Sequence, residues 1–195
     1  MKIYTESKTV LADVQTPVSI YLKIRDLFPE SALLESSDFH GNENSFSFIG
    51  LNPLARFEVR DGWVETGLAA APETKTKIDA GISVADELNR FLRSFEVAGD
   101  NTTADFNGFF GYTAYDAVRY FEDVDPGNVP GNAGDIPDMI YIFYRYLLVV
   151  NHFKNEMTII ENRTEGEISR IDEVLALLEN RNYASYNFAA RGKET

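Results

Sequence analysis

The fold of this chain is organised around residues 33–59, LLESSDFHGNENSFSFIGLNPLARFEV. A strand-like segment, residues 33–37, begins apolar and ends polar, and a turn-rich loop follows it. Two further strand-like runs come next, residues 45–49 and 54–59, and the glycine and proline in residues 50–53 predict a hinge between them. The stretch therefore predicts three strand segments that are separated by one loop and one hinge.

Glu35 and Ser36 stand at the end of the first apolar run, where a buried face would meet a cleft. A carboxylate and a hydroxyl in that place suit a small polar ligand with an apolar body, because a few fixed polar groups orient such a ligand while apolar walls bury the rest. The alternative is a strand that ends in a turn, with Ser36 and Asp38 bonded to nearby backbone. The residues alone favour the second interpretation.

Composition limits the classes of function. The chain has 195 residues, of which 44% are hydrophobic and 25% charged, as expected of one large globular domain. Its net charge of −13 argues against nucleic acid and against anionic membranes, since both attract clustered lysine and arginine. The chain contains no cysteine, which excludes a disulfide frame and a cysteine nucleophile. Without a secretion signal or a long apolar run, we expect a soluble, cytoplasmic protein.

Three helices are predicted from capping signals and apolar spacing. Thr16 and Pro17 begin the first, which runs to about residue 28; Ser83 begins the second; Thr164 and Glu167 form a capping box for the third, which ends near residue 182. The apolar residues expected on the buried faces are Val18, Tyr21, Leu22 and Phe28 in the first helix, Val84, Leu88, Phe91, Leu92 and Phe95 in the second, and Ile168, Ile171, Val174, Leu175 and Leu178 in the third.

Strands are predicted over much of the remaining chain. Residues 3–5 predict a short edge strand, and residues 56–65 alternate across an Asp-Gly turn, which is a strong hairpin signal. Residues 140–151 are nearly continuously apolar and predict a central strand, which a turn joins to residues 156–160.

Two segments carry no strand pattern. Residues 68–81 predict a surface loop and residues 98–103 a linker. Because the strands do not alternate regularly with helices, we expect an α+β fold with largely antiparallel β-sheets and about three packed helices.

Recognised catalytic and metal-binding patterns are missing from the sequence. His40 and His152 lie in predicted turns without a serine or aspartate partner, so no catalytic triad can be assembled from them. Asp123, Asp125 and Asp135 lack the spacing of a calcium loop, and there is no phosphate-binding glycine loop. We therefore predict no catalytic residue, no metal site and no cofactor within this chain.

Several motifs resemble one family. Residues 33–36, LLES, followed by residues 46–50, FSFIG, look like the N-terminal region of anthranilate synthase component I, a chorismate-binding enzyme. Residues 106–122, FNGFFGYTAYDAVRYFE, resemble the family's glycine-rich strand followed by Gly-Tyr-x-x-Tyr-Asp and Val-Arg-Tyr-Phe-Glu. Residues 136–139, IPDM, resemble the Leu-Pro-Asp that precedes a long strand. The resemblance extends over nearly the whole chain.

The resemblance implies a place within a larger enzyme. Residues 1–195 look like a single N-terminal regulatory domain from which the C-terminal chorismate-binding catalytic domain is absent. In the family, the complete protein is a lyase of tryptophan biosynthesis that converts chorismate and ammonia or glutamine into anthranilate and pyruvate. Mg²⁺ is implied for the absent domain, and the implied partners are that domain and a glutamine amidotransferase subunit, component II. We therefore expect the fragment alone to be inactive.

The resemblance also implies an allosteric site for feedback inhibition by L-tryptophan. Leu34, Glu35 and Ser36 resemble one wall of it: Leu34 would pack on the indole ring, Glu35 would accept a hydrogen bond from the ammonium or the indole N–H, and Ser36 would bond the ligand's polar end. Many members carry a basic residue shortly before the FSFIG-like run, where this chain has Asn44 and Ser45. The family's site is completed across the interface with the catalytic domain.

Two alternatives remain open. One is the N-terminal region of aminodeoxychorismate synthase component I, whose similar pocket holds tryptophan as a structural ligand; Ser36 after Glu35 favours the anthranilate enzyme over it. The other is a free-standing amino-acid-binding module. An open reading frame that continues past Thr195 into a catalytic region would support one of the two synthases. A stop codon there would support the free-standing module.

Overall fold

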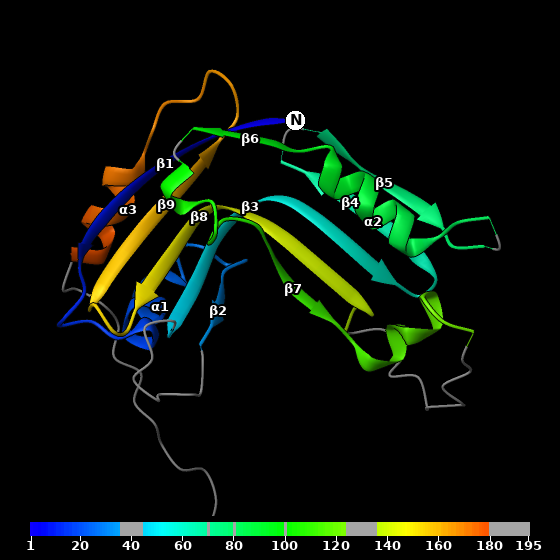
Figure 1. The fold of residues 1–195 in the computed structure, drawn as a ribbon, viewed down its shortest axis with the longest axis horizontal. Coiled ribbons are helices and arrows are strands. Elements are labelled where there is room, and N and C mark those ends of the chain that lie inside the picture. The colour runs from blue at the N-terminus through cyan, green and yellow to red at the C-terminus, as the bar shows by residue number, and fades with distance from the viewer. Residues whose placement is uncertain (36–44, 70, 80, 100, 124–135, 180–195) are drawn as a thin grey trace, which may run out of the picture.

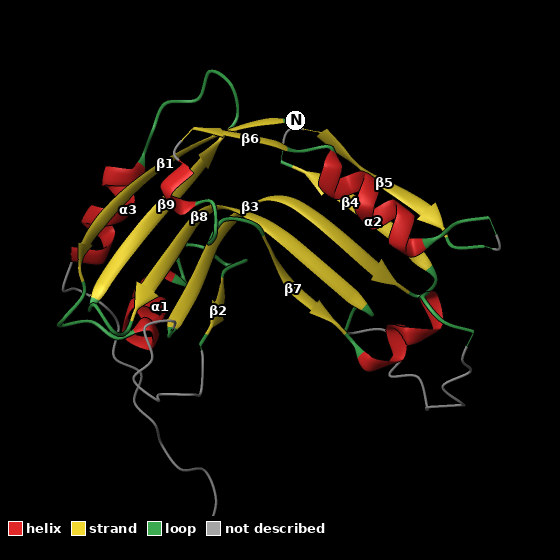
Figure 2. Ribbon diagram, viewed as in Figure 1, coloured by secondary structure: helices red, strands yellow, loops and turns green. Residues whose placement is uncertain are grey.

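The central strand of the fold is β8 (Met139–Asn151), as the apolar run predicts. The computed structural model describes residues 1–35, 45–69, 71–79, 81–99, 101–123 and 136–179, and within them nine strands form a largely antiparallel sheet (Figures 1 and 2). One side of β8 pairs with β3 (Phe46–Arg60). The other side pairs with β9 (Glu156–Arg163) over one half and with β7 (Phe109–Thr113) over the other half.

The remaining strands extend the sheet in the order β5-β4-β3-β8-β9-β1-β6, and β2 pairs with β3 off this path. All pairs are antiparallel except β1 with β6. The α+β prediction is confirmed. The bounds of these strands are Lys2–Leu11 for β1, Ala32–Leu34 for β2, Trp63–Leu68 for β4, Ala71–Lys77 for β5 and Glu96–Gly99 for β6.

The three described α-helices cover different faces of this curved sheet. Helices α1 (Pro17–Ile24) and α3 (Ile171–Glu179) pack on one face, over the even-numbered residues of β8 from Tyr146 to Val150. Helix α2 (Val84–Arg93) packs on the other face, where Phe91 meets Phe57 with ring centroids 5.7 Å apart. Figure 1 shows α1 and α3 near one end of the arch and α2 beside β4 and β5 at the other.

A β-bulge lets strand β3 contribute to both cores. The predicted hinge at residues 50–53 is instead part of one continuous strand, whose register against β8 shifts between Pro53 and Ala55. Asn52 has a φ of 56° at this place. Because a bulge adds one residue to one strand, Ile49 faces α1 while Phe57 faces α2, although both positions are odd-numbered.

Three predictions about strands and loops were wrong. The predicted edge strand at residues 3–5 is the ten-residue strand β1, which β9 and β6 flank on its two sides. The predicted loop at 68–81 contains strand β5, an exposed strand that shows no apolar alternation. The predicted linker at 98–103 contains the end of β6 and the 3-10 helix η1 (Asn101–Thr103).

Helix α1 begins at the predicted cap but buries another face. The Thr16 hydroxyl accepts a hydrogen bond from Ser19 N, and Ser19 Oγ accepts one from Thr16 N in return. The helix ends at Ile24 and its buried residues are Pro17, Ile20 and Ile24, whereas Val18 is 43% exposed. The prediction placed Val18 and Leu22 on the buried face and ended the helix at about residue 28, and both points were wrong.

Helix α3 begins at Ile171, six residues later than a cap at Thr164 predicts. Glu167 Oε2 accepts from Thr164 N at 2.7 Å, but this contact closes a turn, and Ile168 is 85% exposed. The start of the helix is held instead by Glu161 of β9, whose two carboxylate oxygens accept from Arg170 N at 3.0 and 3.1 Å. In helix α2 the Ser83 cap is as predicted, and Leu92 is partly exposed rather than buried.

The turns follow the sequence signals closely. Asp61 and Gly62 both have positive φ, 51° and 77°, as the predicted Asp-Gly hairpin between β3 and β4 requires. The turn at residues 152–155 joins β8 to β9 as predicted. The segment after the glycine-rich strand forms the 3-10 helix η2 (Tyr115–Tyr120). Within the described part of the chain, no helix has the length and apolarity needed to cross a membrane.

Candidate functional site

The predicted effector wall lies at the end of strand β2. Leu34 pairs with Phe48 of β3, and paired residues of an antiparallel ladder share a face, so Leu34 lies on the face opposite α1 and α3. Leu33 packs on the other face, against the core of α1 and α3. Glu35 follows the strand and is exposed. Ser36 lies outside the described residues.

Phe48 belongs to a group of four partly buried phenylalanines on that face. Phe46 and Phe106 have ring centroids 4.9 Å apart, and Phe48 and Phe110 are separated by 5.4 Å. Their rings are tilted, a geometry that aromatic pairs favour over face-to-face stacking. This surface, which we call the phenylalanine face, consists of Phe46, Phe48, Phe106 and Phe110 over the buried side chains of Leu147, Val149 and Ile160.

A reciprocal amide pair anchors the segment that carries Phe106. Asn107 Nδ2 donates to Asn162 Oδ1 at 2.8 Å, and Asn162 Nδ2 donates to Asn107 Oδ1 at 3.0 Å. Asn162 is buried, and it also bonds the Thr5 hydroxyl and the Tyr144 carbonyl. This network fixes the loop before β7 on the sheet, so that Phe106 lies over it. The pairing of Asn107 and Asn162 carries no signal in the sequence, because it depends on a contact between distant segments.

Gly111 brings Phe110 close to the central strand. A Cβ atom at this position would lie 1.7 Å from the carbonyl oxygen of Ile140, so β7 can approach β8 this closely only with glycine. Glycine within a strand marks a bulge or a close backbone approach, and here it permits the close approach.

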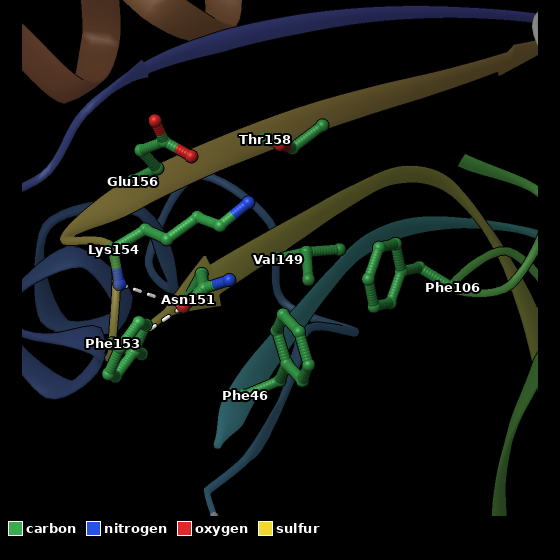
Figure 3. A pocket seen from close by; sticks show the side chains of 8 residues that line it. All are labelled: Phe46, Phe106, Val149, Asn151, Phe153, Lys154, Glu156 and Thr158. Carbon is green, nitrogen blue, oxygen red and sulfur yellow. Dashed lines mark hydrogen bonds between the residues drawn. The ribbon is translucent and has the colours of Figure 1, made fainter. Parts of the chain in front are cut away.

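A pocket of about 430 Å³ lies at one end of the phenylalanine face, beside the turn between β8 and β9 (Figure 3). This volume is within the roughly 300–1,000 Å³ that small-molecule sites occupy. Asn151 Oδ1 accepts hydrogen bonds from the backbone N–H groups of Phe153 and Lys154, both at 3.0 Å. The pocket is lined by Phe46, Phe106, Val149, Asn151, Phe153, Lys154, Glu156 and Thr158.

The chain was compared with family models, curated proteins and solved structures. Anthranilate synthase component 1 of Thermus thermophilus is 35% identical over 148 residues, which are 76% of this chain and 30% of that protein. The same enzyme component of Mycolicibacterium smegmatis is 31% identical over 170 residues, 85% of this chain and 31% of that protein. The chain belongs to the anthranilate synthase component I family.

The fold agrees with this assignment. The crystal structure of anthranilate synthase component I from Streptococcus pneumoniae superposes with a TM-score of 0.52 at 20% identity, over 89% of this chain and 37% of that chain. The present chain thus spans only about a third of the length of the relatives it matches. No family model matches it.

The two runs that suggested the family are neighbours in space. LLES contributes β2, and FSFIG begins the strand with which β2 pairs, from Ala32 opposite Gly50 to Leu34 opposite Phe48. The glycine-rich segment contributes Phe106 and Phe110 to the same face. Family-like residues from three parts of the sequence therefore converge on the phenylalanine face.

The prediction that His152 has no serine partner was wrong. Its Nε2 atom lies 2.7 Å from Ser47 Oγ, and the ring is partly buried. Ser47 is 0% exposed, so a substrate could not reach its hydroxyl, and the contact ties the turn to β3. His40 lies outside the described residues. Among the described residues, no three histidine, aspartate or glutamate side chains come together to hold a metal ion.

Proposed function

We propose that this chain is the N-terminal, tryptophan-sensing domain of an anthranilate synthase component I. The complete protein would convert chorismate and ammonia or glutamine into anthranilate and pyruvate. Membership of the family supports the proposal. The structural observation that carries it is the register of Leu34 with Phe48, which joins the LLES segment to the phenylalanine face.

The groups at this place match the chemistry of tryptophan. Leu34 and the phenylalanine face offer apolar surface to an indole ring. Glu35, which follows strand β2 and is exposed, would accept a hydrogen bond from an ammonium or the indole N–H. Ser36 would supply a hydroxyl to the ligand's polar end. Feedback inhibition further requires that tryptophan favour one arrangement of this domain and the catalytic domain over another.

In the proposed complete protein, the other components of the reaction lie outside this domain. The chorismate site would belong to a C-terminal catalytic domain, and ammonia would come from a glutamine amidotransferase subunit. The described residues gather no set of side chains that fits Mg²⁺, so the magnesium of the reaction would be bound by the catalytic domain.

The test is a Ser36→Phe substitution in a protein that joins this chain to a catalytic domain. Loss of the hydroxyl leaves a ligand group unpaired at a cost of about 1–3 kcal/mol, so the tryptophan concentration for half-inhibition should rise by roughly ten- to a hundred-fold. Chorismate turnover without tryptophan should stay unchanged. Ser36→Ala is the milder companion variant, since it removes the hydroxyl without adding bulk.

Two outcomes would count against the proposal. Unchanged inhibition in Ser36→Phe would remove Ser36 from the effector site. Inhibition and turnover lost together in Ser36→Phe, with both retained in Ser36→Ala, would show a folding defect and not the loss of a ligand contact.

A further inference from the structure

Only one asparagine in the sequence is followed directly by glycine. Asn107 precedes Gly108 in the segment that leads into β7. The backbone nitrogen of the next residue can attack an asparagine side-chain amide, and it does so most readily in an Asn-Gly step, because glycine has no Cβ atom to crowd the approach. This step is therefore a candidate site for spontaneous deamidation.

The peptide that joins these two residues borders open space. Both residues are partly exposed, and a Cβ atom added at Gly108 would meet no atom within 4 Å. Water and hydroxide can therefore reach the peptide nitrogen that must lose its proton, and water can reach the intermediate that must be hydrolysed. Packing leaves room for the reaction at this position.

The Asn107 side chain, in contrast, is bound to other strands. Its amide forms the reciprocal pair with Asn162 of β9, at 2.8 and 3.0 Å, and its Nδ2 lies 3.4 Å from the Thr5 hydroxyl of β1. Cγ can bond to the nitrogen of Gly108 only if the amide leaves these partners and folds back over its own peptide. The reaction therefore requires a local opening of the structure.

We propose that Asn107 is a deamidation site that its pairing with Asn162 protects in the folded chain. The nitrogen of Gly108 loses its proton and bonds to Cγ of Asn107, the bond from Cγ to the amide nitrogen breaks, and ammonia leaves. Water then opens the succinimide ring at one of its carbonyl groups. Opening at Cγ gives aspartate, and opening at the backbone carbonyl gives isoaspartate, in which the main chain runs through Cβ and Cγ. The net reaction converts amide and water into carboxylate and ammonium.

The products cannot restore the native contacts. A carboxylate at position 107 has no N–H group to donate, so one of its oxygens would face Asn162 Oδ1, which accepts from Asn107 Nδ2 at 2.8 Å in the native pair. Reversing the Asn162 amide would break its other bond, in which Nδ2 donates to the Tyr144 carbonyl at 2.9 Å. Opposed acceptors beside the buried Asn162 are unfavourable. Modification should therefore detach the segment that carries Phe106 from the sheet.

The modified fraction should record how long the pair spends open. Deamidation is irreversible, since the ammonia is lost, so each opening that leads to reaction leaves a permanent change beside the phenylalanine face. This inference goes beyond the proposed function and does not rest on it, because the reaction needs neither a ligand nor another domain.

Peptide mapping by mass spectrometry tests the proposal on the 195-residue chain. The chain is incubated in mildly alkaline buffer with and without guanidinium chloride, and conversion of Asn107 to aspartate and isoaspartate is followed with time. We expect a rate that is lower by roughly tenfold or more in the folded chain, because local opening must come first. Equal rates in the two conditions would overturn the protection, and no conversion in the unfolded chain would overturn the site.

Variants of the partners identify the protecting contact. Asn162→Leu removes both amide hydrogen bonds at similar side-chain size, and it should raise the rate at Asn107 in the folded chain by roughly tenfold. Thr5→Val is the matched control, because it alters the same buried network and leaves the reciprocal pair in place. Circular dichroism establishes that each variant is folded. Equal rates in the two variants would exclude the pair as the protecting contact.

Two further measurements do not depend on whether Asn162→Leu folds. Gly108→Ala adds a Cβ atom in open space, so it should fold normally and lose most of the reaction at Asn107. Asn107→Asp carries one product directly, and its urea midpoint should be lower than that of Asn89→Asp, whose side chain is exposed on α2. An undiminished rate in Gly108→Ala would overturn the attack by the backbone nitrogen. Equal midpoints of the two aspartate variants would overturn the loss of the native contacts.

Discussion

At the scale of single residues, buried polar side chains connect segments that are distant in sequence. Glu161 is 1% exposed and accepts hydrogen bonds from Arg170 N and from the Ser169 hydroxyl, the latter at 2.6 Å. Its carboxylate thus satisfies N–H and O–H groups just before helix α3, where negative charge is favourable. Glu161 takes the place of the cap that Thr164 was expected to provide.

Removing this carboxylate should destabilise the fold. Glu161→Ala leaves the part-buried donors of Ser169 and Arg170 without their acceptor, and we expect the free energy of unfolding to fall by about 1–3 kcal/mol. Urea unfolding followed by circular dichroism measures the loss. The control is Glu165→Ala, because Glu165 is exposed in the turn before the helix. Equal stabilities of the two variants would show that Glu161 does not hold the start of α3.

Two buried tyrosines predict an alkaline limit of stability. Burial raises the pKa of Tyr144 and of Tyr146 from 10 to about 12. The folded state therefore keeps these protons after the unfolded chain has released them, so their contribution to stability is complete below pH 10 and is lost as the pH rises toward 12. The measurement is the urea midpoint across this range. Replacing both residues with phenylalanine should flatten the decline, and an equally steep decline in that variant would contradict the assignment.

At this scale the sequence singles out candidate residues that stand within a local motif. Leu34 and Glu35 could be singled out because they end an apolar run within a family-like motif. Lys154 and Glu156 could not, since a charged hairpin turn is ordinary and the pocket exists only through the register of β3, β8 and β9. The pairing of Asn107 with Asn162 likewise joins residues that are far apart in the chain.

At the scale of elements, the sequence predicted the turns, strands and helix caps whose signals lie within their own residues. The Asp61-Gly62 hairpin, the central strand β8 and the cap of α2 agree with the structure for this reason. Strands β5 and β6 were missed because they are strands through pairing with β4 and β1 and show no apolar pattern of their own. The bulge in β3 was read as a hinge, since proline and glycine indicate a break without saying whether pairing resumes.

Strand β7 depends on one glycine. Gly111→Ala would place a Cβ atom 1.7 Å from the Ile140 carbonyl oxygen, so β7 must move away from β8. We expect a loss of roughly 1–3 kcal/mol in unfolding free energy, and a displaced Phe110 that NMR detects as shifted resonances on the phenylalanine face. The control is Gly108→Ala, because no atom lies within 4 Å of the Cβ added there. Similar stabilities of the two variants would mean that β7 tolerates a wider spacing.

At the scale of the whole molecule, the two faces of the sheet differ in what covers them. Helices α1 and α3 cover one face of the sheet. On the opposite face α2 packs near β4, so the four phenylalanines on that face are only partly buried. Sequence patterns predicted the three helices and several of the strands but not this distribution, because the bulge at Pro53 to Ala55 decides which side chains of β3 each face receives.

This organisation predicts a chain that recognises a ligand without transforming chorismate. In the proposed complete protein the chorismate site belongs to the catalytic domain. The groups gathered on the phenylalanine face of this chain are apolar rings with one lysine and one glutamate at the edge, which suit binding. Purified chain with chorismate, ammonia and Mg²⁺ should therefore form no anthranilate above the rate without protein, as measured by anthranilate fluorescence. The same assay on the chain joined to a catalytic domain is the positive control. Anthranilate formed by the chain alone above the rate without protein would contradict this prediction.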